Sequence, residues 1–389
     1  MKKICVITGT RAEYGLLKPL ISKIKNDNQL ELKLIVTGMH LSPEFGLTYK
    51  EIEHDDFIID EKIEILMSSD SSIGINKAMG LAMISFSECY QRLQPDIILV
   101  LGDRYEIFSA VSAATVARIP VAHLHGGETT EGAIDEAMRH SITKMSYLHF
   151  TSTSTYKNRI IQLGEDPSRV FNVGAIGIEN IKNINPLPKD VLERDINFRF
   201  GQYTALVTFH PVTLENNYSS EDQFKILLNA LDQIEGLKVI FTKANSDMDG
   251  RIINTMIDEY VNINRDKYIS FTSMGQLRYL SAMKYVDVVI GNSSSGIIEA
   301  PSFNVPTVNI GDRQRGRIQA KSILNCPAEK EEIVKAINNA LKQEFRKSIR
   351  TLENPYGNGN VSNKVIDEIK LALSKQIDIK KKFYDIKGR

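Results

Sequence analysis

The chain has 389 residues, of which 42% are hydrophobic and 25% charged, an ordinary composition for a globular protein of two or three domains. Lys+Arg and Asp+Glu both total 48, so the zero net charge gives no bulk electrostatic reason to expect a nucleic acid or an anionic membrane as a partner. Three cysteines and no apolar run near the ~18 residues of a membrane helix lead us to expect a cytoplasmic protein without disulfides.

Apolar runs typical of strands alternate with helical patterns along most of the chain. Such alternation predicts parallel sheets covered by helices, and its recurrence in both halves predicts an α/β fold of two doubly wound Rossmann-like domains. The expected strands are 4–8, 32–37, 97–101, 121–125, 148–151, 205–210, 239–243, 268–271, 286–291 and 307–310. The expected helices are 15–25, 77–93, 107–118, 135–145, 223–234, 251–261 and about 364–375.

The two domains are expected to join near residues 176–190, where Pro186 and Pro188 interrupt the periodicity. We therefore predict a first domain over 1–178, a second over 179–375, and a charged tail over 376–389. Ligands of open parallel sheets bind at the carboxyl ends of the strands, so the residues after each strand are the candidates for function.

Strand 4–8 runs into Gly9-Thr10-Arg11 before a helix. One interpretation is an anion site in which the guanidinium of Arg11 binds a phosphate, and the other is a tight turn with a solvated arginine. The spacing of glycine and lysine fits neither a P-loop nor a dinucleotide fingerprint.

Strand 97–101 ends in Gly102-Asp103-Arg104, which places an acid and a base side by side. Asp103 is a candidate for acid–base chemistry, and the alternative is that it caps the following helix.

The segment with the most side chains suited to acid–base or metal chemistry is His123-Leu124-His125-Gly126-Gly127-Glu128. Because side chains alternate along a strand, the two histidines are expected to point to one face of strand 121–125. Asp135 and Arg139 then share a face of the next helix. Carboxylates gathered at one sheet edge suit general acid–base work. A metal site on the histidines is the less favoured interpretation, since a third ligand at suitable spacing is not evident.

The second half offers phosphate-binding chemistry. Pro211 ends the first strand and leaves His210 at its tip. Gly291-Asn292-Ser293-Ser294-Ser295-Gly296 then leads into a helix with Glu299, so hydroxyls and amides suit a diphosphate and the acid suits a ribose. The alternative is a serine-capped helix. Arg313, Arg315 and Arg317 follow the next strand and suit anion binding better than a solvated charge run.

Taken as an ordered set, these segments resemble the UDP-N-acetylglucosamine 2-epimerase family, most closely its hydrolysing bacterial branch. The matching motifs run from residue 4 to about 317. They are Gly9-Thr10-Arg11-Ala12-Glu13-Tyr14-Gly15, Val36-Thr37-Gly38-Met39-His40, Gly102-Asp103-Arg104-Tyr105-Glu106, Gly126-Gly127-Glu128, Arg139-His140-Ser141-Ile142-Thr143-Lys144, Gly291-Asn292-Ser293-Ser294-Ser295-Gly296 and Gly311-Asp312-Arg313-Gln314.

The resemblance implies a glycosyltransferase-B-like fold, with the active site in the interdomain cleft, the catalytic acids on the first domain and UDP bound mainly by the second. It implies anti elimination of UDP from UDP-N-acetylglucosamine, then syn addition of water to 2-acetamidoglucal, which yields N-acetylmannosamine for sialic acid synthesis. It implies no cofactor, no metal, and a homodimer or homotetramer. The UDP-sugar-binding residues that it implies, together with those chosen from the residues themselves, are Arg11, His210, Ser293, Ser294, Ser295, Gly296, Glu299 and Arg313.

The catalytic candidates are Asp103, Arg104, His125, Glu128 and Asp135. Many family members carry Glu where this chain has His125, so either His125 or Glu128 could fill that role. The same variant occurs among enzymes that act on UDP-2,4-diacetamido-2,4,6-trideoxyglucose for legionaminic acid, which makes that sugar the alternative substrate.

Three other functions stay open at this point. A retaining glycosyltransferase of the same fold would use a UDP-sugar and an acceptor. A UDP-sugar sensor would bind without reaction, which the dense acids between Asp103 and Asp135 disfavour. A metal hydrolase would use His123 and His125.

Overall fold

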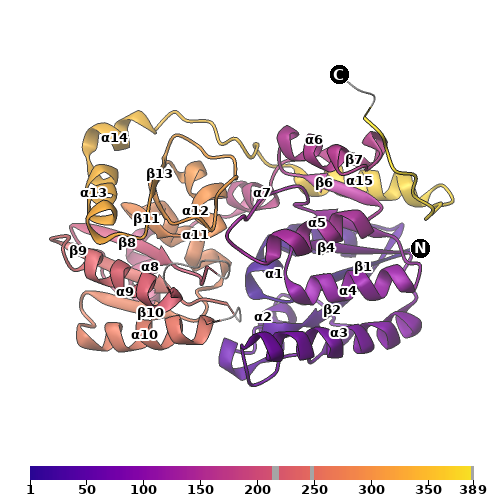
Figure 1. Ribbon diagram of the computed structural model, residues 1–389, viewed down its shortest axis with the longest axis horizontal. Coiled ribbons are helices and arrows are strands. Elements are labelled where there is room, and N and C mark those ends of the chain that lie inside the picture. The colour runs from indigo at the N-terminus through magenta and orange to yellow at the C-terminus, as the bar shows by residue number, and fades with distance from the viewer. Residues whose placement is uncertain (213–218, 246–248, 387–389) are drawn as a thin grey trace. The chain divides into compact units, whose positions relative to one another are not determined.

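The computed structural model describes residues 1–212, 219–245 and 249–386, and it forms two compact units (Figure 1). The first unit contains Met1–Glu128, Asp135–Asn180 and the chain from Tyr356 onward, and the second contains Thr129–Ile134 and Ile181–Pro355. Among the described residues, no helix has both the length and the apolar character needed to cross a membrane.

The first unit is built on a seven-stranded parallel sheet in the order β3-β2-β1-β4-β5-β6-β7. Its strands are β1 Lys2–Thr8, β2 Leu30–Thr37, β3 Glu61–Ile63, β4 Ile97–Leu101, β5 Val121–Leu124, β6 Leu148–Thr151 and β7 Val170–Asn172. Its α-helices are α1 Arg11–Lys25, α2 Tyr49–His54, α3 Ser72–Leu93, α4 Tyr105–Val116, α5 Asp135–Met145, α6 Ser154–Gln162, α7 Ile176–Asn183 and α15 Val361–Leu373, of which α7 runs three residues past the division at Asn180.

The second unit is built on a six-stranded parallel sheet in the order β10-β9-β8-β11-β12-β13. Its strands are β8 Tyr203–Thr208, β9 Leu237–Thr242, β10 Tyr268–Phe271, β11 Val288–Gly291, β12 Thr307–Ile310 and β13 Ile323–Cys326. Its α-helices are α8 Lys189–Asp195, α9 Ser220–Leu231, α10 Gly250–Ile263, α11 Gly275–Tyr285, α12 Ser294–Ile298, α13 Lys330–Leu341 and α14 Gln343–Ser348.

Each sheet has one point where the strand order reverses, and this point decides where a ligand can approach the strand ends. In the first unit β1 lies beside β4, and in the second β8 lies beside β11. The loops after β1 and β4, and those after β8 and β11, therefore lie at the reversal points of the two sheets. These are the loops that carry Arg11, Asp103, His210 and Ser293.

Most predicted strands agree with the structure within one or two residues at each end. Three edge strands of three or four residues, β3, β7 and β13, were not predicted. Several helices were missed as well, including α13, whose apolar positions Ile333, Ile337 and Ala340 do pack into the core of the second unit.

The predicted domain ranges need two corrections. Helix α15, expected in the second domain, belongs to the first unit, because Val361, Val365 and Ile369 pack into its core. The segment Thr129–Ile134, expected in the first domain, belongs to the second unit.

The C-terminal tail was predicted as a separate charged segment, and its last three residues lie outside the described part. The described portion is bound to the first unit. Lys381 Nζ donates to Glu165 Oε2 at 2.6 Å and to the carbonyl oxygens of Lys144 and Ser146, both at 2.7 Å. The backbone N–H of Tyr384 donates to the Gly164 carbonyl at 2.9 Å.

Candidate functional site

Asp103 lies in the loop between β4 and α4 and is held by Arg139 of α5. The guanidinium Nη2 of Arg139 donates to Asp103 Oδ2, and Nη1 donates to the His125 carbonyl at 3.1 Å. The alternative that Asp103 caps α4 is wrong, because the residue at the cap position is Arg104. Arg104 is buried and donates from Nε to Glu106 Oε1 at 2.7 Å, so its side chain is engaged inside the unit.

His125 does not continue strand β5 as the sequence pattern predicted. The strand ends at Leu124, and His125 adopts a left-handed backbone with φ of +64°. The expectation that His123 and His125 point to one face by strand alternation is therefore wrong. The backbone N–H of His125 still donates to the Phe150 carbonyl at 2.9 Å, which fixes the start of the turn.

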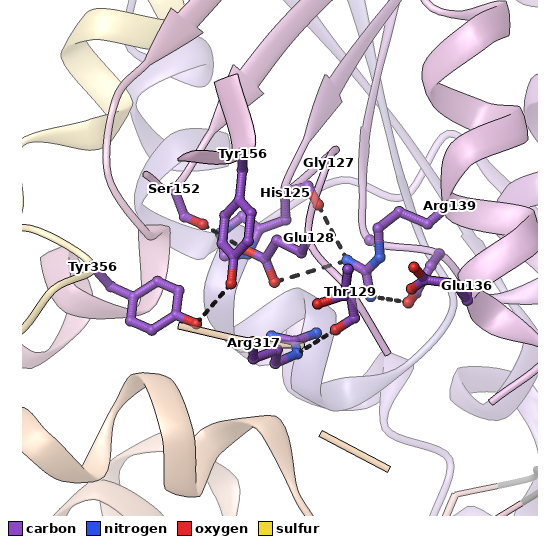
Figure 2. Close-up of polar contacts among 12 residues, drawn as sticks. His125, Gly127, Glu128, Thr129, Glu136, Arg139, Ser152, Tyr156, Arg317 and Tyr356 are labelled. Carbon is purple, nitrogen blue, oxygen red and sulfur yellow. Dashed lines mark hydrogen bonds and ion pairs between the residues drawn. The ribbon is translucent and has the colours of Figure 1, made fainter. Parts of the chain in front are cut away.

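The left-handed turn brings the His125 ring to Glu128, as Figure 2 shows. His125 Nδ1 lies 2.9 Å from Glu128 Oε1, while the backbone N–H of Ile176 donates to His125 Nε2 at 3.3 Å. Since Nε2 accepts a hydrogen bond, the proton of the neutral ring is on Nδ1 and is donated to the carboxylate. This ring is thus a support for Glu128.

Glu128 is only 1% exposed and is surrounded by donors. Ser152 Oγ donates to Oε1 at 2.6 Å, and the Arg139 guanidinium lies 3.8 Å from Oε2 (Figure 2). Arg139 therefore stands between two carboxylates, Asp103 and Glu128, and its positive charge offsets their mutual repulsion. The structure brings Asp103, His125 and Glu128 together around one arginine.

Asp135 begins α5, one turn before Arg139, and is partly exposed. The neighbouring Glu136 lies 3.1 Å from His140 Nε2, so these two residues form an i,i+4 pair along the helix.

His123 has a structural role. Its Nε2 lies 2.7 Å from the Gly102 carbonyl, and burial lowers its pKa to about 3, so it stays neutral and donates to that carbonyl. Among the described residues, no group of three or more His, Cys, Asp and Glu side chains is placed to hold a metal ion.

Arg11 is the first residue of α1, and the loop before it rests on two buried glutamates. Glu13 Oε2 accepts the backbone N–H of Gly9 at 2.7 Å and that of Thr10 at 3.3 Å, while Thr10 Oγ1 caps the helix in return. A Cβ on Gly9 would lie 2.6 Å from the Glu106 side chain, so only glycine fits there. Burial, and after it the charge of Glu106, raises the pKa of Glu13 to about 8.

In the second unit, Asn292 clamps the backbone of His210. Asn292 Oδ1 accepts the His210 N–H at 2.7 Å, and Nδ2 donates to the His210 carbonyl at 2.8 Å. The clamp is possible because Gly291, with φ of +131°, passes so close to β8 that a Cβ would lie 1.9 Å from the Thr208 carbonyl. His210 is 7% exposed and lies at the reversal point of this sheet.

The serine-rich loop caps the short helix α12. Ser293 is its N-cap residue and accepts the N–H of Ser295 at 3.4 Å, and Ser293 and Ser294 are both partly exposed. Ser295 accepts from Tyr279 Oη at 2.9 Å and donates to Glu299, so it connects two neighbouring side chains. Gly296 packs against Thr307 of β12, which donates to its carbonyl at 2.8 Å.

The three arginines after β12 have different partners. Arg313 Nη1 and the buried Gln314 Nε2 both donate to the Asn292 carbonyl, at 3.1 and 2.8 Å. Arg317 Nε donates to the Thr129 carbonyl at 2.9 Å, as Figure 2 also shows, and Arg315 lies 3.6 Å from Glu131. The last two therefore hold the 129–134 segment against the second unit, and Arg313 is the one near the serine loop.

Comparisons with known proteins identify the family of this chain. A family model described as UDP-N-acetylglucosamine 2-epimerase matches residues 22–370. The chain belongs to this family. It is 44% identical over 385 residues to GDP/UDP-N,N'-diacetylbacillosamine 2-epimerase (hydrolyzing) of Campylobacter jejuni, with 99% of each chain covered. It is 40% identical over 387 residues to polysialic acid biosynthesis protein P7 of Escherichia coli, with 99% of this chain and 98% of that protein covered. These relatives fit the hydrolysing branch predicted from the sequence, and the chain is an enzyme of the 2-epimerase family.

Solved structures confirm the fold class of two doubly wound, glycosyltransferase-B-like domains. A UDP-N-acetylglucosamine 2-epimerase from Listeria monocytogenes, described as putative, aligns with a TM-score of 0.79 at 20% identity over 99% of each chain. The UDP-GlcNAc 2-epimerase of Neisseria meningitidis bound to UDP-GlcNAc aligns with a TM-score of 0.77 at 19% identity, over 95% of this chain and 100% of that one. At these identities the likeness concerns the fold alone.

The sequence did not predict five supporting residues: Glu13, Glu106, Ser152, Asn292 and Gln314. Asn292 and Gln314 stand inside motifs that were recognised, so their position beside a strand end was a usable signal. Ser152 stands beyond β6, where nothing in the sequence distinguishes it from any other loop serine.

Proposed function

We propose that this chain is a hydrolysing 2-epimerase that eliminates UDP from a UDP-2-acetamido sugar and adds water to the product. In the first step the C2–H and C1–O bonds break, C1 and C2 become doubly bonded, and UDP leaves. In the second step water supplies a hydrogen to C2 and a hydroxyl to C1, which releases a free sugar of the manno configuration. The arrangement of Asp103, Arg139 and Glu128 carries this proposal, because two carboxylates and one cation at a strand end are what proton transfer requires.

Asp103 is the leading acid–base group in this proposal. It lies at the end of β4, beside the point where the sheet order reverses, and its side chain is 18% exposed while that of Glu128 is 1% exposed. An acid that transfers protons must reach the sugar, and the greater exposure of Asp103 favours it over Glu128 in this role. Asp135 is proposed as the second acid. Glu128, supported by His125 and Ser152, takes the place of the family's glutamate.

Loss of UDP needs positive charge and N–H donors on the diphosphate. The proposed binding residues are Arg11 of the first unit and His210, Ser293, Ser294, Glu299 and Arg313 of the second. Asn292 contacts two of these residues: its side chain hydrogen-bonds the His210 backbone, and its own backbone carbonyl accepts from Arg313.

The sugar we propose is UDP-N,N'-diacetylbacillosamine, the 2,4-diacetamido-2,4,6-trideoxy sugar. The supporting observation is that relatives at 44% and 34% identity, from C. jejuni and Legionella pneumophila, both carry this sugar in their names. UDP-N-acetylglucosamine, which would give N-acetylmannosamine for sialic acid, is the second candidate. It is favoured by the family description and by the relation to a polysialic acid biosynthesis protein.

The experiment is to incubate the purified full-length protein with each UDP-sugar in deuterated water and to follow the products by NMR. Release of UDP with a manno sugar that carries deuterium at C2 is the expected result, and the faster substrate identifies the sugar. Release of UDP with retention of the C2 proton would contradict the elimination mechanism. Absence of UDP release from both sugars, in a folded sample that binds UDP, would contradict the function itself.

A further inference from the structure

His40 is a fully buried histidine that has no part in the chemistry proposed above. It stands in the 3₁₀-helix η1, Gly38–Leu41, directly after β2. Each ring nitrogen contacts a threonine hydroxyl: Nε2 lies 3.0 Å from Thr8 Oγ1, and Nδ1 lies 2.8 Å from Thr48 Oγ1. Both threonines are buried as well, so the ring joins the end of β1 to the start of α2.

The direction of each hydrogen bond follows from Thr8. Its hydroxyl has a single hydrogen, which it donates to the Thr10 carbonyl at 3.3 Å, so Thr8 Oγ1 can only accept from the ring. The proton of the neutral His40 ring is therefore on Nε2, and Nδ1 accepts from Thr48. Burial lowers the pKa of His40 to about 3, although a hydrogen bond to the Thr10 backbone opposes this, so the ring stays neutral near pH 7.

These contacts complete the hydrogen bonds of the Thr10 backbone, directly before Arg11. Glu13 Oε2 accepts the Thr10 N–H at 3.3 Å. The Thr10 carbonyl accepts from Thr8 Oγ1 and from the N–H of Tyr14, the latter at 3.0 Å. This carbonyl shares its planar peptide group with the nitrogen of Arg11. A fixed carbonyl therefore fixes the backbone from which the Arg11 side chain extends.

Gly38 allows η1 to lie against the same loop. Its φ is +58°, and a Cβ at this position would lie 3.1 Å from the Gly9 carbonyl oxygen. His40 follows two residues later. The charge of Arg11 contributes to the low pKa of His40, so the guanidinium is within electrostatic range of the ring. A protonated ring would repel the guanidinium, whereas the neutral ring leaves the charge of Arg11 available to an anion.

The loop after β4 shows a similar arrangement. There His123, also buried and neutral, donates from Nε2 to the Gly102 carbonyl at 2.7 Å, and the next residue is Asp103. In each loop a neutral histidine orients the backbone just before a candidate functional side chain, directly after β4 and by way of Thr8 after β1.

We propose that His40 is a positioning residue for nucleotide binding, which acts through the backbone of Thr10 on Arg11. The inference rests on the proposed function, in which Arg11 binds the diphosphate of UDP. It assigns to His40 a role in affinity for the nucleotide and none in proton transfer.

The test compares three substitutions of His40 by calorimetric titration with UDP. His40→Gln keeps a donor near the Nε2 position, His40→Asn keeps a partner for Thr48 near the Nδ1 position, and His40→Leu keeps neither. We expect the UDP dissociation constant to rise at least about 10-fold in the asparagine and leucine variants and to stay within about 3-fold in the glutamine variant. A purely structural role would not favour glutamine over asparagine, since both place an amide in the same buried space.

A double-variant cycle tests whether His40 acts through Arg11. In the Arg11→Ala background, His40→Asn should raise the dissociation constant by no more than about 2-fold further, because the side chain that it positions is absent. Thr8→Val removes the bridging hydroxyl at similar volume and should raise the constant about 3–10-fold. His149→Asn is the matched control: His149 is buried beside Glu165 in the first unit, so its loss should lower the melting temperature without changing UDP affinity.

Circular dichroism checks that each variant is folded. Equal rises in the glutamine and asparagine variants, or losses that add in the double variant, would overturn the positioning role of His40. A wild type that binds UDP but converts neither sugar would contradict the proposed activity alone, and a folded wild type that binds no UDP would overturn both.

Discussion

His125 donates from Nδ1 to Glu128 Oε1 across 2.9 Å, and its other nitrogen is occupied by the backbone N–H of Ile176. The ring is thereby fixed between the turn and helix α7, and its one proton points at the carboxylate. A histidine held in this way orients a neighbour, and Glu128 is the group whose position it sets.

Replacement of His125 should therefore reduce turnover without abolishing it. His125→Asn keeps a donor near the Nδ1 position, whereas His125→Gly removes it, and both residues accept the left-handed backbone. We expect kcat to fall about 10–100-fold in the glycine variant and less than about 10-fold in the asparagine variant. Steady-state UDP release measures both. Equal losses would show that the hydrogen bond to Glu128 has no role.

Asp103→Asn should abolish most of the activity while the fold persists. The amide keeps the volume and can still contact Arg139, but it cannot exchange a proton at neutral pH. A fall in kcat of about 10²–10⁴-fold is expected. Asp190→Asn, on exposed helix α8, is the control and should behave as wild type. Near-normal turnover of a folded Asp103→Asn protein would exclude Asp103 as an acid or base.

Asn292→Ala should weaken UDP binding. It removes both hydrogen bonds to the His210 backbone and leaves a buried N–H and a buried carbonyl without them, at a cost of about 1–3 kcal/mol. Calorimetric titration with UDP should give a dissociation constant raised at least about 10-fold. Asn338→Ala, on an exposed position of α13, is the control. Unchanged UDP affinity in the Asn292 variant would show that its hydrogen bonds to the His210 backbone do not contribute to nucleotide binding.

Glu13 makes stability depend on pH in a definite direction. Its pKa is raised from 4.5 to about 8, so in this window the folded protein holds a proton that the unfolded chain has lost. The free energy of unfolding then falls as pH rises toward 8. Between pH 6 and 9 the wild type should lose about 2–3 kcal/mol more than Glu13→Gln, which stays neutral throughout. Urea unfolding at both values measures this difference.

Glu53→Gln, at an exposed ion pair with Lys62, is the matched control for the Glu13 variant and should follow the wild type. Parallel pH profiles for wild type and Glu13→Gln would show that Glu13 is ionised in the folded protein at neutral pH.

Lys381 binds the C-terminal tail to the first unit through its ion pair with Glu165. Burial by itself raises the pKa of Glu165, but hydrogen bonds from His149, Lys144 and Lys381 outweigh it and lower the pKa to about 2. This contribution to stability is present above pH 4.5 and is lost as pH falls toward 2. At neutral pH Lys381→Met should lower stability by about 1–3 kcal/mol and speed chymotryptic cleavage near Phe383. Lys382→Met, on an exposed side chain, should change neither.

The sequence predicted the framework better than the details of the site. Strands such as Ile97–Leu101 and Leu148–Thr151 are continuous apolar runs, and their ends follow from pattern alone. The turn at His125 could not be predicted, because its left-handed backbone depends on the Phe150 carbonyl and on the partners of its ring. The support of Glu128 by Ser152 joins residues 24 positions apart, and no local period carries that information.

Assignment of α15 failed for the same physical reason. Its apolar stripe of Val361, Val365 and Ile369 predicts an amphipathic helix, but a stripe does not say which core it completes. Glu179 accepts from the N–H of Ser362 at 2.6 Å, and this contact over 183 positions places the helix in the first unit.

Because the chain passes from one unit to the other at four places, the first unit cannot be completed during synthesis until the second has been made. A ribosome that has produced residues 1–180 has synthesised every strand of the first sheet but not helix α15, which completes its core. The 129–134 segment has at that stage no Arg317 to hold it. The nascent first half must therefore wait, with apolar surface uncovered, for the segment from Tyr356 onward to emerge or for a chaperone to shield it.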